Sequence, residues 1–420
     1  MKLKSSKKDI KANRGITLIA LVITIIVLLI LAGITIASLT GNNAIISKSG
    51  EAKNASEIAN EKEELEVEVI RFSDKRGNLD PDKVVNGLNK DLKNLKEATN
   101  TNGKFPVKVE YKNGHKYQIT EDGDIFISVN AGDTAPSDSN AVYTSGNYTA
   151  VIPAGFTVSA TESSIENGLV VTDGTTNQNE WVWIPVSSSD LAKMYTEDTT
   201  GWNMLGTSVN TKLKTKELTT QNTFKLGSRE LPRTNPGTTA DPYYREPDVL
   251  SEYDTDQSYR TQAGFGDLAD MATKLKNDYK DMIDSVRENG GFYIGRYELG
   301  KDSSNNPQVK AGTVMTSTNW YNLYSACKSF SSGKVESRMI WGCQWDQVCR
   351  FISTLGDNKV SSLDDSTSYG NYSGSTDYKT GTRNKCITNN IYDLAGNYWE
   401  WTQEAYYTNN RAFRGRQLQQ

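Results

Sequence analysis

The chain has 420 residues, a length that suggests two or three domains, and a formal charge of −4. Its first fifteen residues carry a net charge of +5, which leaves −9 for the rest. A mildly acidic body argues against nucleic acid as a partner, because neutralising phosphates requires a basic face. The single histidine, His115, disfavours histidine-based metal sites and catalytic centres of the Ser-His-Asp or Cys-His type.

The first predicted element is a transmembrane helix over residues 16–39, which hold no charge in 24 positions. A helix needs about 20 apolar residues to cross the hydrocarbon core of a membrane. A secretory signal is the alternative, but its apolar region is usually about 7–15 residues long and ends at a small-residue cleavage site. Because the basic cluster precedes the apolar segment, we expect a single-pass protein with a cytoplasmic amino terminus and an extracellular or surface-exposed distal part.

The basic leader, residues 1–15, meets the apolar segment in the sequence RGITLIAL. This junction resembles the type IV prepilin signal. In that family a membrane prepilin peptidase cuts after the glycine and methylates the new amino terminus, which implies cleavage after Gly15 and N-methylation of Ile16. The family's spanning helix packs against neighbouring pilins or pseudopilins. The usual glutamate five residues into the mature chain is Ala20 here, a departure that bears on filament assembly.

Residues 40–129 are predicted to form a long helix and a β-meander. Apolar residues recur at helical intervals from Ile45 to Val69, and a second short helix is expected around Val84 to Leu95. Apolar residues then alternate on both sides of Asn113-Gly114, a strong hairpin signal. A long helix packed on a small antiparallel sheet is the pilin-like arrangement.

Residues 130–147 contain several turn formers and few aliphatic side chains, which favours a linker. The remainder, 148–420, is predicted to form a mixed domain. It includes strands near 149–159, 168–172 and 180–186, a polar insertion from about Ser187 to Gly266, a helix capped by Asp267, an aromatic strand from Gly291, and helices around Trp320 and Trp345.

The distal motifs follow the order WIPV, GFYIGRYE, IYDLAGNYWEWT and Arg414-Gly415. This order resembles the formylglycine-generating enzyme, or sulfatase-modifying factor, family, over about residues 143–420. The resemblance implies a variant of the C-type lectin fold and leads us to expect a domain truncated at its carboxyl end. The expected class is therefore α+β, with a pilin-like module followed by a C-type lectin-like domain.

The enzymes of that family oxidise a substrate cysteine with a pair of cysteines near the carboxyl terminus, beyond a motif that here corresponds to Arg411 to Arg416. No cysteine follows Cys386, so we predict no catalytic residue and no enzymatic activity. The four cysteines are expected to be buried free thiols rather than a bridge or a reactive thiol.

The same family binds calcium beside its tryptophan motif. The resemblance places the metal ligands on Asp393, the carbonyls of Gly396 and Tyr398, and Glu400, and these oxygen donors suit a hard cation. The alternative is that Asp393 caps a turn and Glu400 forms an ordinary ion pair.

Four residues near the carboxyl end are candidates for ligand contact, since Tyr and Asn combine rigid contact area with adaptable hydrogen bonding. They are Tyr406, Tyr407, Asn409 and Asn410, and the alternative is a solvated loop. The leading hypothesis is a pilin-like, surface-displayed protein whose non-catalytic lectin-type domain binds a protein or a glycan. The alternatives are a cysteine oxidase that lacks its catalytic end and a minor pseudopilin with a structural role in a filament or secretion system.

Overall fold

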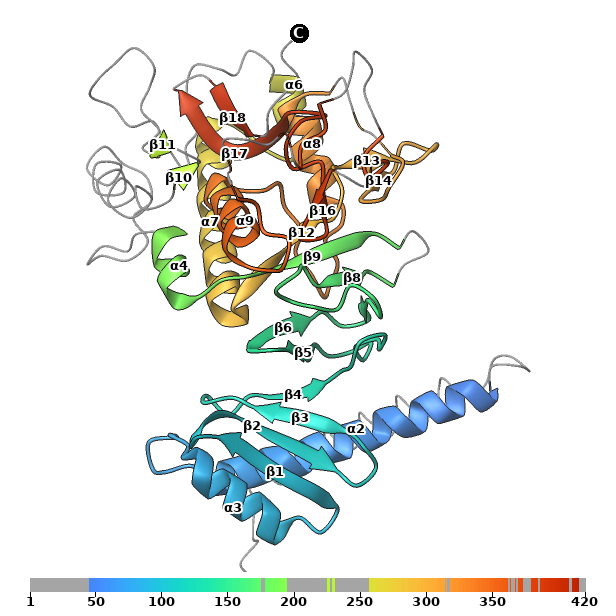
Figure 1. The fold of residues 1–420 in the computed structure, drawn as a ribbon, viewed down its shortest axis with the longest axis vertical. Helices are drawn as coiled ribbons and strands as arrows, with labels where there is room; N and C mark the ends of the chain where they lie inside the picture. The colour runs from blue at the N-terminus through green and yellow to red at the C-terminus, as the bar shows by residue number, and fades with distance from the viewer. Residues whose placement is uncertain are drawn as a thin grey trace, which may run out of the picture. The chain divides into compact units, whose positions relative to one another are not determined.

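A computed structural model describes residues 45–174, 178–194, 225–226, 229–230, 257–313, 315, 318–361, 363, 367, 369–372, 379–383, 386–407 and 410–414 (Figure 1). The chain divides into two compact units, Met1–Asp80 and Pro81–Gln420. The mixed α+β class is confirmed by its helices and several sheets.

The first unit contains helix α2, Ile45–Phe72, whose 28 residues span about 42 Å. This confirms that the segment predicted from apolar spacing is helical. The predicted membrane helix 16–39, with the processing residues Gly15 and Ile16, lies outside the described residues. Among the helices that the structure describes, none combines the length and the apolar character that a membrane crossing needs.

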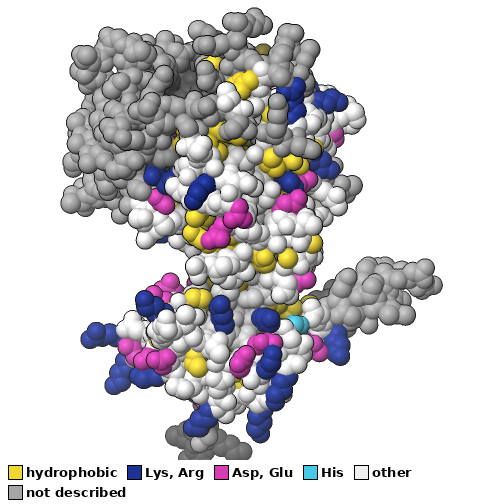
Figure 2. Space-filling view, viewed as in Figure 1, with side chains coloured by type: hydrophobic (Ala, Val, Ile, Leu, Met, Phe, Trp, Pro, Cys, Tyr) yellow, Lys and Arg dark blue, Asp and Glu magenta, His cyan; other side chains and the backbone are white. Residues whose placement is uncertain are grey.

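The second unit begins with helix α3, Pro81–Asp91, which packs across β1 and β2 and buries Val84 and Leu88. A six-stranded sheet follows in the order β1-β2-β3-β4-β5-β6. Its strands are β1 Leu95–Thr101, β2 Lys104–Tyr111, β3 Lys116–Ile119, β4 Ile125–Ser128, β5 Ala141–Ser145 and β6 Tyr148–Ile152. Figure 2 shows acidic and basic side chains intermixed on one face of the molecule. One such ion pair joins β1 to β2, where Lys96 Nζ lies 2.9 Å from Glu110 Oε1.

The predicted hairpin at Asn113-Gly114 is confirmed, with Val107 opposite Ile119 in the β2–β3 pair. Gly114 has a φ of 96°, which suits a residue without a side chain. Strand β1 was not predicted, because its sequence LKEATNT lacks a regular apolar alternation. The strand conformation of β1 therefore depends on its pairing with β2 and not on its own sequence pattern.

Strand β5 lies inside the range 130–147 that the composition favoured as a linker. It pairs in parallel with β4 and antiparallel with β6. Ala141, Val142 and Tyr143 are buried, so this short apolar group, and not the surrounding polar residues, determines the local structure. The division into domains at this point stays a prediction.

A second sheet has four antiparallel strands in the order β12-β9-β8-β7. These are β7 Thr157–Val158, β8 Val170–Thr172, β9 Glu180–Pro185 and β12 Gly291–Gly295. The predicted strands WIPV and GFYIG thus become neighbours, with Trp183 opposite Tyr293. Within the described residues, strand β12 lies at one end of this sheet.

Helices α7 and α9 contact this sheet, and three further described helices accompany them. In chain order these helices are α4 Ser188–Met194, α6 Gln257–Gln262, α7 Leu268–Asn289, α8 Trp320–Lys328 and α9 Gly342–Thr354. Helix α7 confirms its predicted signals: the Asp267 side chain accepts a hydrogen bond from the Asp270 amide, and Gly290 ends the helix with a φ of 69°. Helices α4 and α6 lie in the range predicted as a polar insertion.

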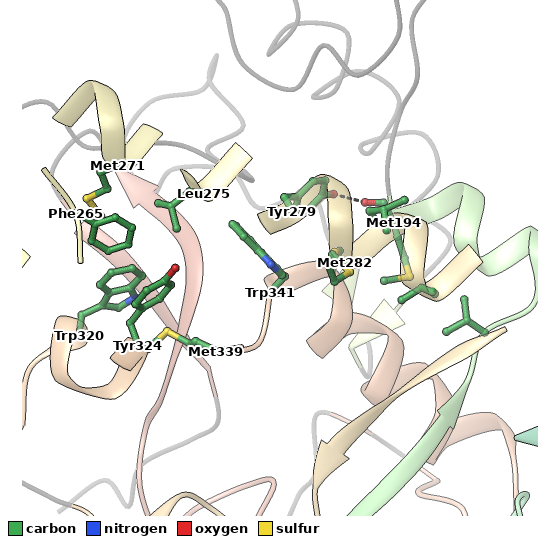
Figure 3. Close-up of a cluster of buried hydrophobic side chains, with 14 residues drawn as sticks. Met194, Phe265, Met271, Leu275, Tyr279, Met282, Trp320, Tyr324, Met339 and Trp341 are labelled. Carbon is green, nitrogen blue, oxygen red and sulfur yellow. Dashed lines mark hydrogen bonds between the residues drawn. The ribbon is translucent and has the colours of Figure 1, made fainter. Parts of the chain in front are cut away.

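The core beside α7 and α8 is built from aromatic and sulfur-containing side chains (Figure 3). The rings of Trp341 and Tyr279 pack edge to face, with their centroids 5.0 Å apart. The Tyr279 hydroxyl donates a hydrogen bond to the Met194 carbonyl at 2.5 Å. Trp320 stacks on Tyr324 at 5.2 Å. The Tyr279 contacts thus join α7 to the start of α9 and to the end of α4.

The remaining described strands form small hairpins. They are β10 Lys225–Leu226 with β11 Arg229–Glu230, β13 Gly300–Lys301 with β14 Pro307–Gln308, β15 Ile387–Thr388 with β16 Ile391–Tyr392, and β17 Glu400–Tyr407 with β18 Asn410–Arg414. Trp320 Nε1 donates to the Thr402 carbonyl at 2.9 Å, which fastens β17 to α8.

Candidate functional site

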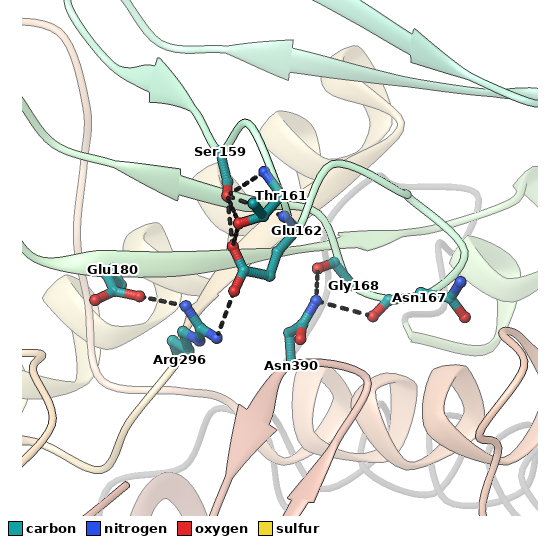
Figure 4. A network of polar contacts seen from close by, with 8 residues as sticks. All are labelled: Ser159, Thr161, Glu162, Asn167, Gly168, Glu180, Arg296 and Asn390. Carbon is teal, nitrogen blue, oxygen red and sulfur yellow. Dashed lines mark hydrogen bonds and ion pairs between the residues drawn. The ribbon is translucent and has the colours of Figure 1, made fainter. Parts of the chain in front are cut away.

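The end of β12 is anchored by Arg296, which follows the strand in the GRYE motif. Arg296 Nη1 lies 2.5 Å from Glu180 Oε2, and Nη2 lies 3.4 Å from Glu162 Oε1 (Figure 4). The hydroxyl of Ser159 donates to Glu162 at 2.6 Å and, together with other contacts, holds the pKa of Glu162 below its usual value. This network fixes the direction in which the chain leaves the sheet, and Glu298 follows two residues later.

Asp393 forms the base of a buried group of carboxylates. It is fully buried and has a φ of 56°, in the left-handed region. Its Oδ1 accepts a hydrogen bond from Asn371 Nδ2 at 3.1 Å. Its Oδ2 accepts from Thr380 Oγ1 and from the Gly381 amide, each at 2.9 Å. Asp393 therefore joins three segments of the chain, which suits the predicted turn-capping alternative.

Glu298 and Glu400 complete this carboxylate cluster. Glu298 accepts hydrogen bonds from Asn397 Nδ2 and from the Tyr398 amide. Burial, with a smaller contribution from the nearby Asp393 charge, raises the pKa of Glu298 to about 8. Burial and then the charge of Glu298 raise the pKa of Glu400 well above its usual value. Glu400 Oε2 is buried and has no hydrogen-bond partner among the described residues.

The carboxylate cluster contains two of the predicted calcium ligands. Asp393 and Glu400 do lie near each other, and Glu298 adds a third carboxylate that the prediction did not include. A cation would offset the repulsion among these groups, and Glu400 Oε2 has the capacity to bind one. Both Asp393 oxygens, however, already accept protein hydrogen bonds. Among the described residues, no set of three or more acidic, histidine or cysteine side chains has the arrangement of a metal site. The donor set thus fits calcium in part, and calcium stays a prediction.

A cavity of about 670 Å³ lies next to the cluster. Glu298 and Glu400 line it, together with all five residues of β12. Its walls carry many aromatic side chains, among them Trp181, Trp183, Phe330, Trp345, Trp399 and Trp401. This volume is within the range of about 300–1,000 Å³ that is typical of ligand sites.

Trp399 is the exposed aromatic residue of this cavity. Its side chain is 42% exposed, whereas Trp401 packs partly buried against the core beside α7. Trp399 is therefore placed where a ligand in the cavity could contact it.

Three of the four predicted ligand residues, Tyr406, Tyr407 and Asn410, belong to the strands β17 and β18. Tyr407 pairs with Asn410, and Tyr406 belongs to β17. Asn409 and the side chains of the other three residues lie outside the described part of the chain. Their role in ligand contact stays a prediction.

The four cysteines are unbridged, as the sequence favoured. Cys327 lines the cavity, and burial raises the pKa of its thiol to about 12. This thiol therefore stays protonated near neutral pH and is a weak nucleophile.

Sequence reasoning missed Glu298 and Trp399 as site residues. Glu298 directly follows the aromatic strand, and a carboxylate after a buried strand end is a signal that could have been used. Trp399 alternates with two side chains that face inward, Tyr398 and Glu400, and this spacing was the available sign of its exposure.

Comparison with known proteins gives no significant match: no protein-family model, no curated protein and no solved structure matches this chain.

Proposed function

We propose that this chain is a membrane-anchored, surface-displayed binding protein with a pilin-like amino terminus and a non-catalytic lectin-type distal domain. The cavity of about 670 Å³, with Trp399 exposed at its wall, is the observation that carries this proposal. Exposed tryptophans beside concave sites are typical contact residues, since a large rigid ring contributes much contact area at a small entropy cost. The anchor rests on the apolar segment 16–39 and its resemblance to prepilin signals.

The chemistry of the cavity favours binding over catalysis. Its cysteine, Cys327, is a protonated thiol. Glu298 accepts hydrogen bonds from Asn397 and from the Tyr398 amide, and Glu400 has a buried carboxyl oxygen. In addition, Trp399 lies between two residues that belong to the carboxylate cluster or contact it. The cluster is therefore placed to position Trp399.

Calcium is part of the proposal. Asp393, Glu400 and the carbonyls of Gly396 and Tyr398 would hold the ion, with Glu298 beside them. Bound calcium would supply positive charge to this group of carboxylates. The residues of the chain would then hold the tryptophan segment in one conformation.

The test uses the full chain in detergent micelles. It is screened against surface glycans and against surface-protein extracts, and Trp399→Ala is compared with Tyr259→Ala, an aromatic residue of α6 that is 37% exposed. We expect saturable binding that Trp399→Ala weakens at least tenfold and Tyr259→Ala leaves unchanged. A folded protein that binds neither class, or that loses nothing in Trp399→Ala, would refute the proposal.

The anchor is tested separately by mass spectrometry of the membrane-derived protein. We expect an amino terminus at N-methylated Ile16. Unprocessed chain recovered from the soluble fraction would contradict the pilin-like part of the proposal.

A further inference from the structure

In the part of the chain that the structure describes, one edge of strand β12 has no neighbouring strand. In an antiparallel pair, alternate residues exchange hydrogen bonds with the neighbouring strand, and the residues between them point their N–H and C=O groups away. The Val186 amide donates to the Gly290 carbonyl, and the Arg296 amide donates to the Glu180 carbonyl. With the register of the pair, this assigns the even-numbered residues 290–296 to the β9 side.

The backbone groups of Gly291, Tyr293 and Gly295 therefore point away from β9. Among the residues that the structure describes, no strand pairs with this edge, and no hydrogen bond reaches these outward groups. An unpaired strand edge is a template for another strand, because each free donor and acceptor is costly to leave without a partner when it is shielded from water.

The unpaired edge faces the cavity, since all residues from Gly291 to Gly295 line it. The cavity is also walled on both sides of the sheet plane. Trp181 and Tyr293 lie on one side, where Phe330 contacts Trp181, and Phe292, Ile294 and Trp345 lie on the other. A strand placed in this cavity would direct its alternate side chains toward one apolar wall and then the other.

We propose that the cavity receives an extended segment of a partner protein, which pairs with β12 as a fifth strand of the β7–β9 and β12 sheet. This inference rests on the proposed binding function and names its partner class. A row of backbone donors and acceptors matches a polypeptide, whose own groups repeat with the same spacing, whereas a glycan has no such repeat. Because both walls are apolar, the segment carries apolar side chains on both faces. Backbone pairing supplies affinity, and the aromatic walls select the side chains.

The first experiment measures hydrogen exchange of the full chain in detergent at single-amide resolution. In the free protein, the amides of Tyr293 and Gly295 should exchange at least about 100-fold faster than those of Phe292 and Ile294, which bond to β9. If the outward amides are equally protected in the free protein, residues of this chain fill the cavity and the proposal is overturned.

The second experiment selects ligands from a phage-displayed library of linear peptides of about 12 residues. We expect peptides with an apolar stretch of about five residues, and their addition should slow exchange at Tyr293 and Gly295 at least tenfold. Tyr293→Ala and Tyr293→Pro form a matched pair: both remove the ring, and only proline removes the outward N–H. The selected peptides should bind Tyr293→Pro at least tenfold more weakly than Tyr293→Ala.

Three outcomes would overturn the inference: no peptide enriched, equal binding to both variants, or a glycan that protects the outward amides in place of a peptide. The exchange measurement on the unmodified chain decides the question if Tyr293→Pro does not fold. A surface glycan or protein that binds at Trp399 without changing exchange at β12 would leave the proposed function standing and refute this inference alone.

Discussion

Replacing Glu298 by glutamine tests whether ionisation of a carboxyl in the cluster lowers the free energy of unfolding. Glutamine keeps the size of the side chain and an oxygen that accepts from the Tyr398 amide, but it cannot ionise. In the native chain, burial and Asp393 raise the pKa of Glu298 to about 8 from its ordinary value of 4.5. The folded state therefore holds the proton more tightly than the unfolded state.

The sign of the effect follows from this difference. Below pH 4.5 the carboxyl is protonated in both states, and its contribution to stability is fully present. As the pH rises toward 8, the unfolded chain ionises first, so the free energy of unfolding falls. The difference from 4.5 to about 8 corresponds to about 5 kcal/mol, at about 1.4 kcal/mol per pH unit. Because the side chain is only partly buried, we expect about half of that amount.

The assay is urea denaturation of the full chain in detergent with a chelator, from pH 4 to pH 8.5. Glu298→Gln should match the native chain near pH 4 and should be more stable by about 2–3 kcal/mol at pH 8.5. Glu97→Gln, at an exposed position of β1, is the control and should change little at any pH. If the difference between Glu298→Gln and the native chain does not depend on pH, the reasoning about the cluster is wrong.

Three further predictions concern the same region. Gly291→Ala should destabilise the fold by about 1–3 kcal/mol in denaturant titrations, because the added Cβ would lie 2.4 Å from a ring carbon of Trp183; Gly333→Ala, where nothing lies within 4 Å of the new atom, should cost less than about 0.5 kcal/mol. Calcium at about 100 times its dissociation constant should stabilise the native chain by about 2.7 kcal/mol, and Glu400→Gln should remove most of this gain; a melting temperature that calcium does not change would contradict the calcium proposal. Trp399→Ala should change the free energy of unfolding by less than about 1 kcal/mol because the ring is 42% exposed, whereas Trp183→Ala should cost about 3–5 kcal/mol; equal costs in thermal melts would contradict the described burial.

Local signals predicted the elements whose boundaries depend on nearby residues. Asp267 and Gly290 define the ends of α7 through a side-chain cap and a left-handed residue, and both are visible in the sequence. Asn113-Gly114 likewise specifies its hairpin through turn geometry. In each case the residues that determine the structure lie within one helical turn or one hairpin of the element.

Features that depend on distant residues were not predictable in this way. Strand β5 is a strand because β4 and β6 pair with it, although the surrounding composition is that of a linker. Glu298 joins Asp393 and Glu400 only after β12 pairs with β9 and the chain returns about a hundred residues later. The free edge of β12 is a property of the sheet order, which no short window of sequence contains.

The parallel pairing of β4 with β5 has a mechanical consequence for the binding function proposed above. Residues 129–140 leave β4 and return beside it, so tension applied beyond β6 reaches the meander through backbone hydrogen bonds between neighbouring strands. Paired strands must slide past each other to separate, so their hydrogen bonds bear the load together. An unstructured linker would instead extend before it transmitted force. Under the proposed function, force on a bound ligand would therefore be transmitted to residues 81–128 through these paired strands.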